Sequence, residues 1–282
     1  MKTLAVLKQD MEFNRGLSSL IEVLKNIAVA QYRVMEKKVR SFAPLLDAVQ
    51  TFGTVINVGH TTHPFIDSSD KPQAVIAVTS DSGLLGGLNM QVVSAALELL
   101  KQHPGQLVVV GARGKLYASD SGVPFAAFPG ITEEDRFEQA MQLRDYVLSR
   151  VLKGNFGSLK VVYPRPVSFT VQKVEMVAFL PFSFAQAGEK TGDEKGTDII
   201  FESDPGDILE YLVHVWVGQR LFEIFGLSRL AEYAARYVHL EESLQKLKDM
   251  DGKLRLQYFK VRHELIDRNM RELFSARLLY AS

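Results

Sequence analysis

Two heptad stripes, one near each end of the chain, constrain its fold more than any other sequence feature. Between Leu17 and Phe52, and again between Leu230 and Leu265, apolar residues recur in alternating steps of four and three. This repeat is typical of the seam between two supercoiled helices. The N-terminal stripe comprises Leu17, Ile21, Leu24, Ala28, Gln31, Met35, Lys38, Phe42, Leu45, Val49 and Phe52, and only Gln31 and Lys38 break it. The C-terminal stripe comprises Leu230, Tyr233, Tyr237, Leu240, Leu244, Leu247, Asp251, Leu254, Tyr258, Val261 and Leu265. We therefore expect the two ends of the chain to pair as one long antiparallel coiled coil with a domain inserted between them.

The N-terminal stripe predicts a helix from near Leu17 to about Thr54, with an earlier start left open. Pro44 lies inside this segment and should kink or break the helix, because proline lacks the backbone N–H that the helix ladder needs. We expect the helical arm to occupy residues 1–58. The Gly-, Thr-, His- and Pro-containing segment that follows, Asn57–Lys71, is typical of a loop.

Strands and helices alternate over residues 72–182. Apolar runs at Gln73–Ser80, Leu107–Gly111, Leu159–Pro164 and Lys173–Leu180 indicate strands, and amphipathic segments at Asn89–Gln102 and Thr132–Lys153 indicate helices. Asn89 is a suitable N-cap, and Thr132 begins a T-x-x-D sequence close to a capping box. Alternation of this kind predicts a Rossmann-like α/β domain with an open, largely parallel sheet.

The remainder of the chain divides into a polar loop and a helical arm. Residues 183–204 are rich in Gly, Lys and Glu and should be flexible, and residues 205–282 should be helical. Gly226 and Ser228 predict a break before the long final helix. Asp251-Gly252 interrupts the C-terminal stripe, so we expect local softness there.

Composition excludes several classes of protein. The 282 residues are 46% hydrophobic, with 33 basic and 33 acidic side chains, which argues against a dedicated nucleic-acid binder. No cysteine is present, so disulfides, thiolate catalysis and cysteine-ligated metals are excluded. The N-terminal residues resemble neither a signal peptide nor a transit peptide, and no apolar run is long enough to span a membrane. We expect an intracellular protein that reaches a membrane only through partners.

A glycine cluster at Ser80–Asn89 lies between a predicted strand and a predicted helix, where phosphate-binding loops occur. Its spacing matches neither dinucleotide nor P-loop motifs, so a tight turn is favoured over nucleotide binding. His60 and His63 could share a metal, but no third ligand is evident nearby. We find no catalytic motif, and we expect no cofactor.

Basic side chains gather on the predicted helices. Lys253, Arg255, Lys260, Arg262, Arg268, Arg271 and Arg277 outnumber Glu264, Asp267 and Glu272 near the C-terminus, and Arg33, Lys37, Lys38 and Arg40 form a second group. Two interpretations remain open. The cations could be a solubilising helix surface, or they could form a positive collar that meets acidic loops of a partner.

Several segments resemble the γ subunit of the rotary F-type ATP synthase. Ser80–Asn89 matches eight of ten positions of the family's S-D-R-G-L-C-G-G-L-N turn, with Ser82 and Leu85 in place of Arg and Cys. Gly111–Gly114 resembles the family's G-x-K-G, Phe201–Pro205 its E-P-D-P, Ser228–Met250 its S-x-x-x-E-x-A-A-R-M-x-A-M, and Leu256–Asp267 its L-x-Y-N-K-A-R-Q-x-x-I-T. The N-terminal signature N-T-x-K-I-T-x-A-M is poorly kept, so the chain resembles a divergent member.

The resemblance implies a central rotor shaft that couples ion flow to conformational change in the catalytic β subunits. Implied partners are the α and β subunits, the ε subunit and the c-ring, at the cytoplasmic face of the cell inner membrane. The implied contacts with β are Arg262, His263, Asp267 and Leu24, the implied seam is Leu24, Ile27, Val34, Leu254, Tyr258, Val261 and Leu265, and the turn residues are Ser80, Asp81, Gly83, Gly86, Gly87 and Asn89. The alternative is a free-standing nucleotide-binding or regulatory protein that uses this turn as a ligand site.

Overall fold

The computed structural model describes residues 2–39, 42–55, 63–67, 71–182 and 203–280. The contacts divide the chain into two compact units. The coiled-coil unit consists of Met1–Ala30 and Tyr237–Ser282, and the sheet unit consists of Gln31–Arg236. Two helices, α1 (Leu4–Lys38) and α6 (Pro205–Tyr280), each contribute to both units.

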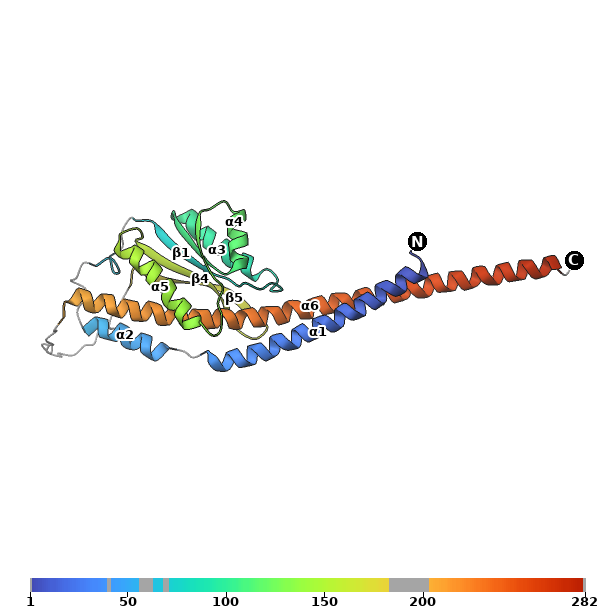
Figure 1. Ribbon diagram of the computed structural model, residues 1–282, viewed down its shortest axis with the longest axis horizontal. Coiled ribbons are helices and arrows are strands. Elements are labelled where there is room, and N and C mark those ends of the chain that lie inside the picture. The colour runs from blue at the N-terminus through green and yellow to red at the C-terminus, as the bar shows by residue number, and fades with distance from the viewer. Residues whose placement is uncertain (1, 40–41, 56–62, 68–70, 183–202, 281–282) are drawn as a thin grey trace, which may run out of the picture. The chain divides into compact units, whose positions relative to one another are not determined.

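The sheet unit contains five strands in the order β3-β2-β1-β4-β5 (Figure 1). The strands are β1 (Gln73–Val78), β2 (Gly105–Val110), β3 (Phe125–Phe128), β4 (Ser158–Pro166) and β5 (Gln172–Leu180). All neighbouring pairs are parallel except β4 and β5, which are antiparallel. The prediction of a Rossmann-like, largely parallel sheet between two long terminal helices is confirmed.

Helices cover both faces of this sheet. The remaining helices are α2 (Ala43–Val55), α3 (Leu88–Gln102), α4 (Ala112–Asp120) and α5 (Arg136–Leu152). Residues of β1 alternate between the two layers, because successive strand side chains point to opposite faces. Ala74 and Ile76 join the larger core with α5 and the first part of α6, whereas Val75 and Ala77 pack with α3 and α4.

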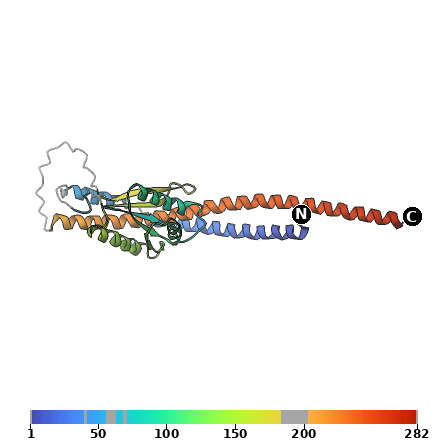
Figure 2. The same ribbon diagram turned by 90° about the horizontal axis from the view of Figure 1, so that it is seen from above.

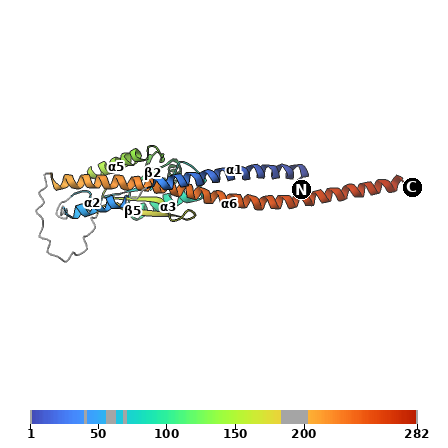
Figure 3. The ribbon, with the colours of Figure 1, turned by 90° about the horizontal axis from the view of Figure 1, so that it is seen from below.

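Two glycines of α6 face side chains of α5, the helix that lies beside α6 (Figure 3). A Cβ at Gly218 would lie 2.8 Å from Met141 Cε, and one at Gly226 would lie 3.1 Å from an Arg136 nitrogen. The predicted helix break at Gly226 and Ser228 is therefore wrong. Helix α6 is continuous there, and Gly226 provides space rather than a stop.

Other element boundaries also differ from the predictions. Helix α1 begins at Leu4, well before Leu17, and ends at Lys38. Helix α2 begins at Ala43, so Pro44 lies in a first helical turn, where a missing N–H breaks no helix bond. Helix α5 begins at Arg136, with Asp135 at the N-cap position but without a side-chain capping bond. Thr132 Oγ1 accepts a hydrogen bond from the Asp135 N–H at 3.4 Å.

Two elements were not predicted at all, the helix α4 and the strand β3. The predicted flexible loop at 183–204 lies almost entirely outside the described residues. Within the described part of the chain, no helix has the length and apolar character needed to cross a membrane.

In the coiled-coil unit, α1 and α6 run antiparallel beside each other (Figure 2). Ile21 packs with Leu240, Leu244 and Leu247, and the Lys25 ammonium lies 2.7 Å from the Glu241 carboxylate. Along α1 a buried residue recurs every seven positions. These residues are Leu7, Asn14, Ile21, Ala28 and Met35. The predicted antiparallel coiled coil is confirmed.

Candidate functional site

The sheet unit has a topological switch point at the carboxyl end of β1. The chain passes from β1 outward to β2 and β3, and then returns to β4 on the other side of β1. Open α/β sheets bind their ligands in the crevice that such a reversal leaves beyond the strand ends. The glycine turn that sequence analysis singled out, Ser80–Asn89, lies at this position.

Helix α6 fills this crevice with its own side chains. The remaining cavity is about 10 Å³. It is lined by Thr79, Ser80, Leu85, Leu88, Asn89, Ile131, Pro164, Ser228, Arg229 and Glu232. A space of this size holds one water molecule at most. The geometry therefore does not favour the alternative of a nucleotide site at this turn.

Hydrogen bonds inside the turn connect β1 to α3. The Ser80 N–H donates to Asn89 Oδ1 at 3.2 Å, and Asn89 Nδ2 donates to Ser80 Oγ at 2.8 Å. Ser80 Oγ in turn donates to the Ser82 carbonyl at 2.9 Å. Asn89 is buried in the first turn of α3, and the N-cap is Gly87. The predicted N-cap role of Asn89 is thus wrong, because its side chain bonds to the preceding strand end.

Asp81 connects the turn to neighbouring segments, and glycine at position 130 leaves room for its carboxylate. The Ala112 N–H donates to Asp81 Oδ1 at 2.7 Å, and a Cβ at Gly130 would lie 2.2 Å from this carboxylate. Gly86 has φ +59°, which favours glycine, whereas Leu84 adopts φ +64° despite its side chain. The turn therefore has a structural role, in which Asp81 accepts a hydrogen bond from the backbone N–H of Ala112.

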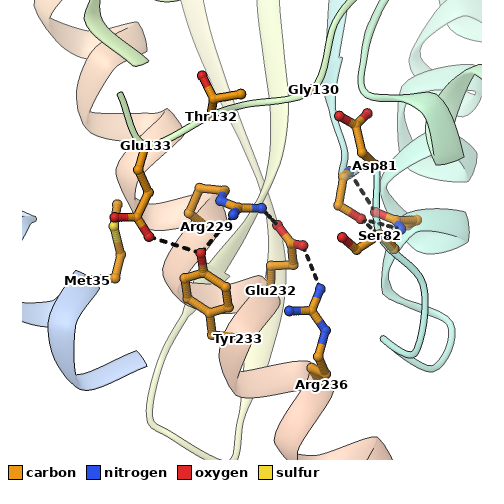
Figure 4. Close-up of polar contacts among 12 residues, drawn as sticks. Met35, Asp81, Ser82, Gly130, Thr132, Glu133, Arg229, Glu232, Tyr233 and Arg236 are labelled. Carbon is orange, nitrogen blue, oxygen red and sulfur yellow. Dashed lines mark hydrogen bonds and ion pairs between the residues drawn. The ribbon is translucent and has the colours of Figure 1, made fainter. Parts of the chain in front are cut away.

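A partly buried ionic network lies beside this turn, on the side of α6 (Figure 4). We define the ionic network as Lys38, Glu133, Arg229, Glu232, Tyr233 and Arg236. Glu232 is only 3% exposed and accepts from Arg229 at 2.6 Å and from Arg236 at 2.8 Å. A carboxylate this deeply buried needs such charged partners to offset its desolvation.

The second half of the network joins α6 to two other segments. Arg229 donates to the Tyr233 hydroxyl at 2.7 Å, and that hydroxyl donates to Glu133 Oε1 at 3.1 Å. The other oxygen of Glu133 lies 2.8 Å from the Lys38 ammonium. One continuous chain of contacts thus links the end of α1, the loop before α5, and α6.

Electrostatics within the network follow from these contacts. The hydrogen bond from Lys38 holds the pKa of Glu133 below its usual value, assisted by Tyr233 and opposed by burial. Burial raises the pKa of the Tyr233 phenol, so the hydroxyl keeps its proton further into the alkaline range than a free tyrosine does. Both shifts preserve the charges and donors on which the network depends.

Arg136 lies beside the ionic network, between Phe222 and Met35. It has no acidic partner in hydrogen-bond contact in the described part of the chain. Its guanidinium lies 4.4 Å from the Phe222 ring centroid, and one nitrogen lies 3.7 Å from Met35 Sδ. Burial lowers its pKa. A cation over an aromatic face is favourable, so Phe222 compensates part of the desolvation cost.

The heptad stripes contain two members of the ionic network, Tyr233 in the C-terminal stripe and Lys38 in the N-terminal stripe. The charge of Lys38 is explained by Glu133, a residue 95 positions further along the chain. The buried Glu232 occupies the acidic position of the family-like Ser228–Met250 segment, and this was the signal that could have indicated it.

The predicted seam residues fall into two groups. Leu24 packs beside Ile21 in the coiled-coil unit, whereas Ile27 and Val34 are 47% and 50% exposed. Placing these two residues in the seam was wrong, because the buried positions of α1 are Ala28 and Met35, one residue later.

On α6, the predicted seam residues Leu254, Tyr258 and Val261 are partly buried, whereas Leu265 is half exposed. The proposed contacts Arg262, His263 and Asp267 lie on the exposed surface of the same helix. Large apolar side chains are exposed with them. They are Leu265, Ile266, Met270, Leu273 and Phe274. Such a concentration of exposed apolar side chains marks a surface for protein partners.

No group of three metal-ligating side chains occurs within the described ranges. His60 lies outside them. The other candidate, His63, accepts a hydrogen bond from the Phe65 N–H on its Nδ1 at 3.2 Å, and burial lowers its pKa. One ring nitrogen of His63 is thus already engaged by a backbone N–H.

Comparison with known proteins assigns the family. A family profile described as ATP synthase matches residues 3–277, so the chain belongs to this family. The ATP synthase gamma chain of Pelotomaculum thermopropionicum is 23% identical, with 97% of each chain covered. That of Clostridium acetobutylicum is 30% identical over 73% of this chain and 72% of its own length.

A solved structure has the same fold. The match is to a chain in the Euglena gracilis mitochondrial ATP synthase (OSCP/F1/c-ring, rotational state 3), with a TM-score of 0.70 and 18% identity. It covers 98% of this chain and 93% of that chain. The resemblance predicted from the turn and helix motifs is thereby confirmed.

Proposed function

We propose that this chain is the γ subunit of an F-type ATP synthase and acts as its central rotor shaft. The observation that carries the proposal is the family match over residues 3–277, together with relatives that are γ chains over nearly their full length. The geometry agrees with a mechanical role. The crevice in which an α/β sheet would bind a ligand is filled by α6, a 76-residue helix.

The shaft would act by presenting different faces to different subunits. A ligand or partner shifts a conformational equilibrium only through contacts that differ between the states. An asymmetric helix pair inside a ring of α and β subunits makes different contacts with each catalytic β subunit, so each is biased toward a different nucleotide affinity. Rotation driven by ion flow then moves every site through binding, synthesis and release. In this proposal the chain acts mechanically, and the catalytic groups belong to the β subunits.

The partners divide between the two units. The coiled-coil unit would lie within the ring of α and β subunits, and the sheet unit, whose α/β foot domain we place at residues 72–182, would bind the ε subunit and the c-ring. Membrane association would be peripheral and through these partners, at the cytoplasmic face of the cell inner membrane.

We assign the contact with β to Arg262, His263 and Asp267 on α6 and to Leu24 on α1. The first three are supported by their exposure and by the family-like segment Leu256–Asp267. Arg262 is the cation of this group, and charge complementarity with acidic loops would set the register of the contact. Leu24 is partly buried in the seam, so only part of its side chain would be available for contact with β.

The test is reconstitution with α and β subunits from the same genome. One copy of the chain should co-elute with a hexamer and support multi-site ATP hydrolysis. Arg262→Glu should reduce turnover by on the order of tenfold, because it reverses a contact charge. Arg268→Glu makes the same change at another exposed position of α6 and should have a smaller effect. Failure to form a complex with any such pair would overturn the proposal, and equal effects of the two variants would overturn the assignment of Arg262.

A further inference from the structure

Two polar residues interrupt the apolar seam of the coiled-coil unit at the same level. Asn14 occupies the buried heptad position between Leu7 and Ile21 and is 6% exposed. Asp251 occupies the corresponding position of the α6 stripe, and both residues line one groove between the helices. At the next layer, by contrast, Ile21 packs with the buried Leu240, Leu244 and Leu247.

The polar atoms of this layer are incompletely satisfied. Asn14 Nδ2 and Asp251 Oδ1 are buried and have no hydrogen-bond partner among the described residues. The second oxygen of Asp251 accepts from Arg255 Nε at 2.8 Å. A buried donor and a buried acceptor that remain unpaired favour any opening that admits water to them.

Glycines weaken both helices at this level. Gly16 and Gly252 are the two glycines of the coiled-coil unit, and each lies within two residues of the polar layer. A Cβ at either position would meet nothing within 4 Å, so neither glycine is required for close packing. Glycine in a helix interior lowers helix stability relative to alanine.

Open grooves flank the layer on two sides. One, of about 390 Å³, is bordered by Asn14, Asp251 and Gly252. The other, of about 350 Å³, is bordered by Asn14 together with Phe13 and Met250. The layer therefore has fewer packing contacts on its sides than a filled seam, and a small opening would admit water from the grooves to its buried polar atoms.

We infer that the layer of Asn14 and Asp251, with Gly16 and Gly252, is a hydrated joint at which the coiled coil opens and bends more readily than at the layers on either side. Unpaired polar atoms, two glycines and two grooves act together at one level. The inference rests on the helix pair itself, so it stands or falls independently of the proposed rotor function.

Hydrogen exchange of backbone amides in the isolated full-length chain tests the joint. Amides near Asn14 and Asp251 should exchange at least tenfold faster than those near Ile21 and Leu244, because local opening sets the rate. They should also exchange faster than amides near Leu7. Simple fraying from the end of α1 would produce the opposite order for Leu7 and Asn14, and that order would overturn the inference.

Variants sharpen the test. Gly16→Ala with Gly252→Ala, and separately Asn14→Leu with Asp251→Leu, should slow exchange at the joint toward the rate of the Ile21 layer. The matched control is Asn26→Ala, which also raises helix propensity at an exposed position of α1 but lies away from the joint. It should leave exchange near Asn14 unchanged. Equal slowing by the control would show that the layer has no special softness.

Discussion

The two units use the same ion pair chemistry in different surroundings. In the sheet unit the Glu232 carboxylate is 4% exposed and lies between two arginines of α6. In the coiled-coil unit the Glu241 carboxylate, on the same helix, is 49% exposed and contacts Lys25. The desolvation that makes a buried charge depend on its partners is small for an exposed one. Apolar side chains of α6 pack in both units. The difference is that the charges of Glu232 are buried within one helix, whereas the exposed Glu241 pairs across the seam with α1.

Glycines show the same difference. In the sheet unit a Cβ at Gly114 would lie 2.2 Å from Thr79 Oγ1, so this position of α4 admits no side chain. In the coiled-coil unit Gly16 has open space around it. Steric fit thus specifies the sheet unit residue by residue, whereas the coiled coil is specified mainly by periodicity.

The largest expected effect is the loss of the buried carboxylate. Glu232→Gln should lower the free energy of unfolding by about 3–5 kcal/mol, because it leaves Arg229 and Arg236 without a counter-charge. Glu241→Gln is the matched change in the coiled-coil unit and should cost less than about 1 kcal/mol. Urea unfolding of the full-length chain, followed by circular dichroism, measures both. Equal costs would remove the distinction between the two units.

A smaller effect distinguishes the seam of α1 from its outer face. Ile21→Ala should cost about 2–5 kcal/mol, since it creates a cavity among Leu240, Leu244 and Leu247. The same substitution at Ile27, which is 47% exposed, should cost well under half as much. Thermal unfolding of both variants checks this. A larger cost at Ile27 would restore that residue to the seam.

Alkaline pH should destabilise the sheet unit through Tyr163. This tyrosine is fully buried, and burial, with the nearby Glu175 charge, raises its pKa to about 12. Because the folded state favours the protonated phenol, its stabilisation is complete below about pH 10 and is lost as pH rises toward 12. The loss should reach about 2–3 kcal/mol. Denaturant unfolding across this range should show it, and Tyr163→Phe should reduce the pH dependence.

The smallest effects should have opposite signs in the two units. Gly114→Ala should lower stability by about 1–3 kcal/mol, because its methyl group overlaps Thr79 and Val109. Gly16→Ala should raise stability by about 0.5–1 kcal/mol, because alanine fits the open space and favours the helix. Chemical denaturation of the two variants provides the comparison. A destabilised Gly16 variant would contradict the description of its surroundings.

Sequence patterns predicted what depends on local repetition. The heptad stripes indicated the paired helices, and the apolar runs indicated β1, β2, β4 and β5. The strand β3 has only four residues, FAAF, and α4 has nine, so neither is long enough for a clear period. Gly226 was misread as a break because its reason, the approach of Arg136, lies 90 residues away in the sequence.

Among the functional features, too, those marked by local sequence were predicted and those that depend on distant residues were not. Motifs located the turn at Ser80–Asn89 and the exposed cations of α6. Periodicity could not reveal the ionic network, because Glu133 is 95 residues from Lys38 and 100 from Tyr233. Nor could it show that α6 fills the switch-point crevice, since that depends on how a distant helix packs against the strand ends.

Because α6 lies in that crevice, a mechanical force on this helix acts on the sheet. Ser228, Arg229 and Glu232 lie against the residues that end β1 and β4, where an enzyme of this architecture would hold a substrate. A twisting force on α6 is therefore passed on, within the sheet unit, to the end of β4 and to the turn that follows β1.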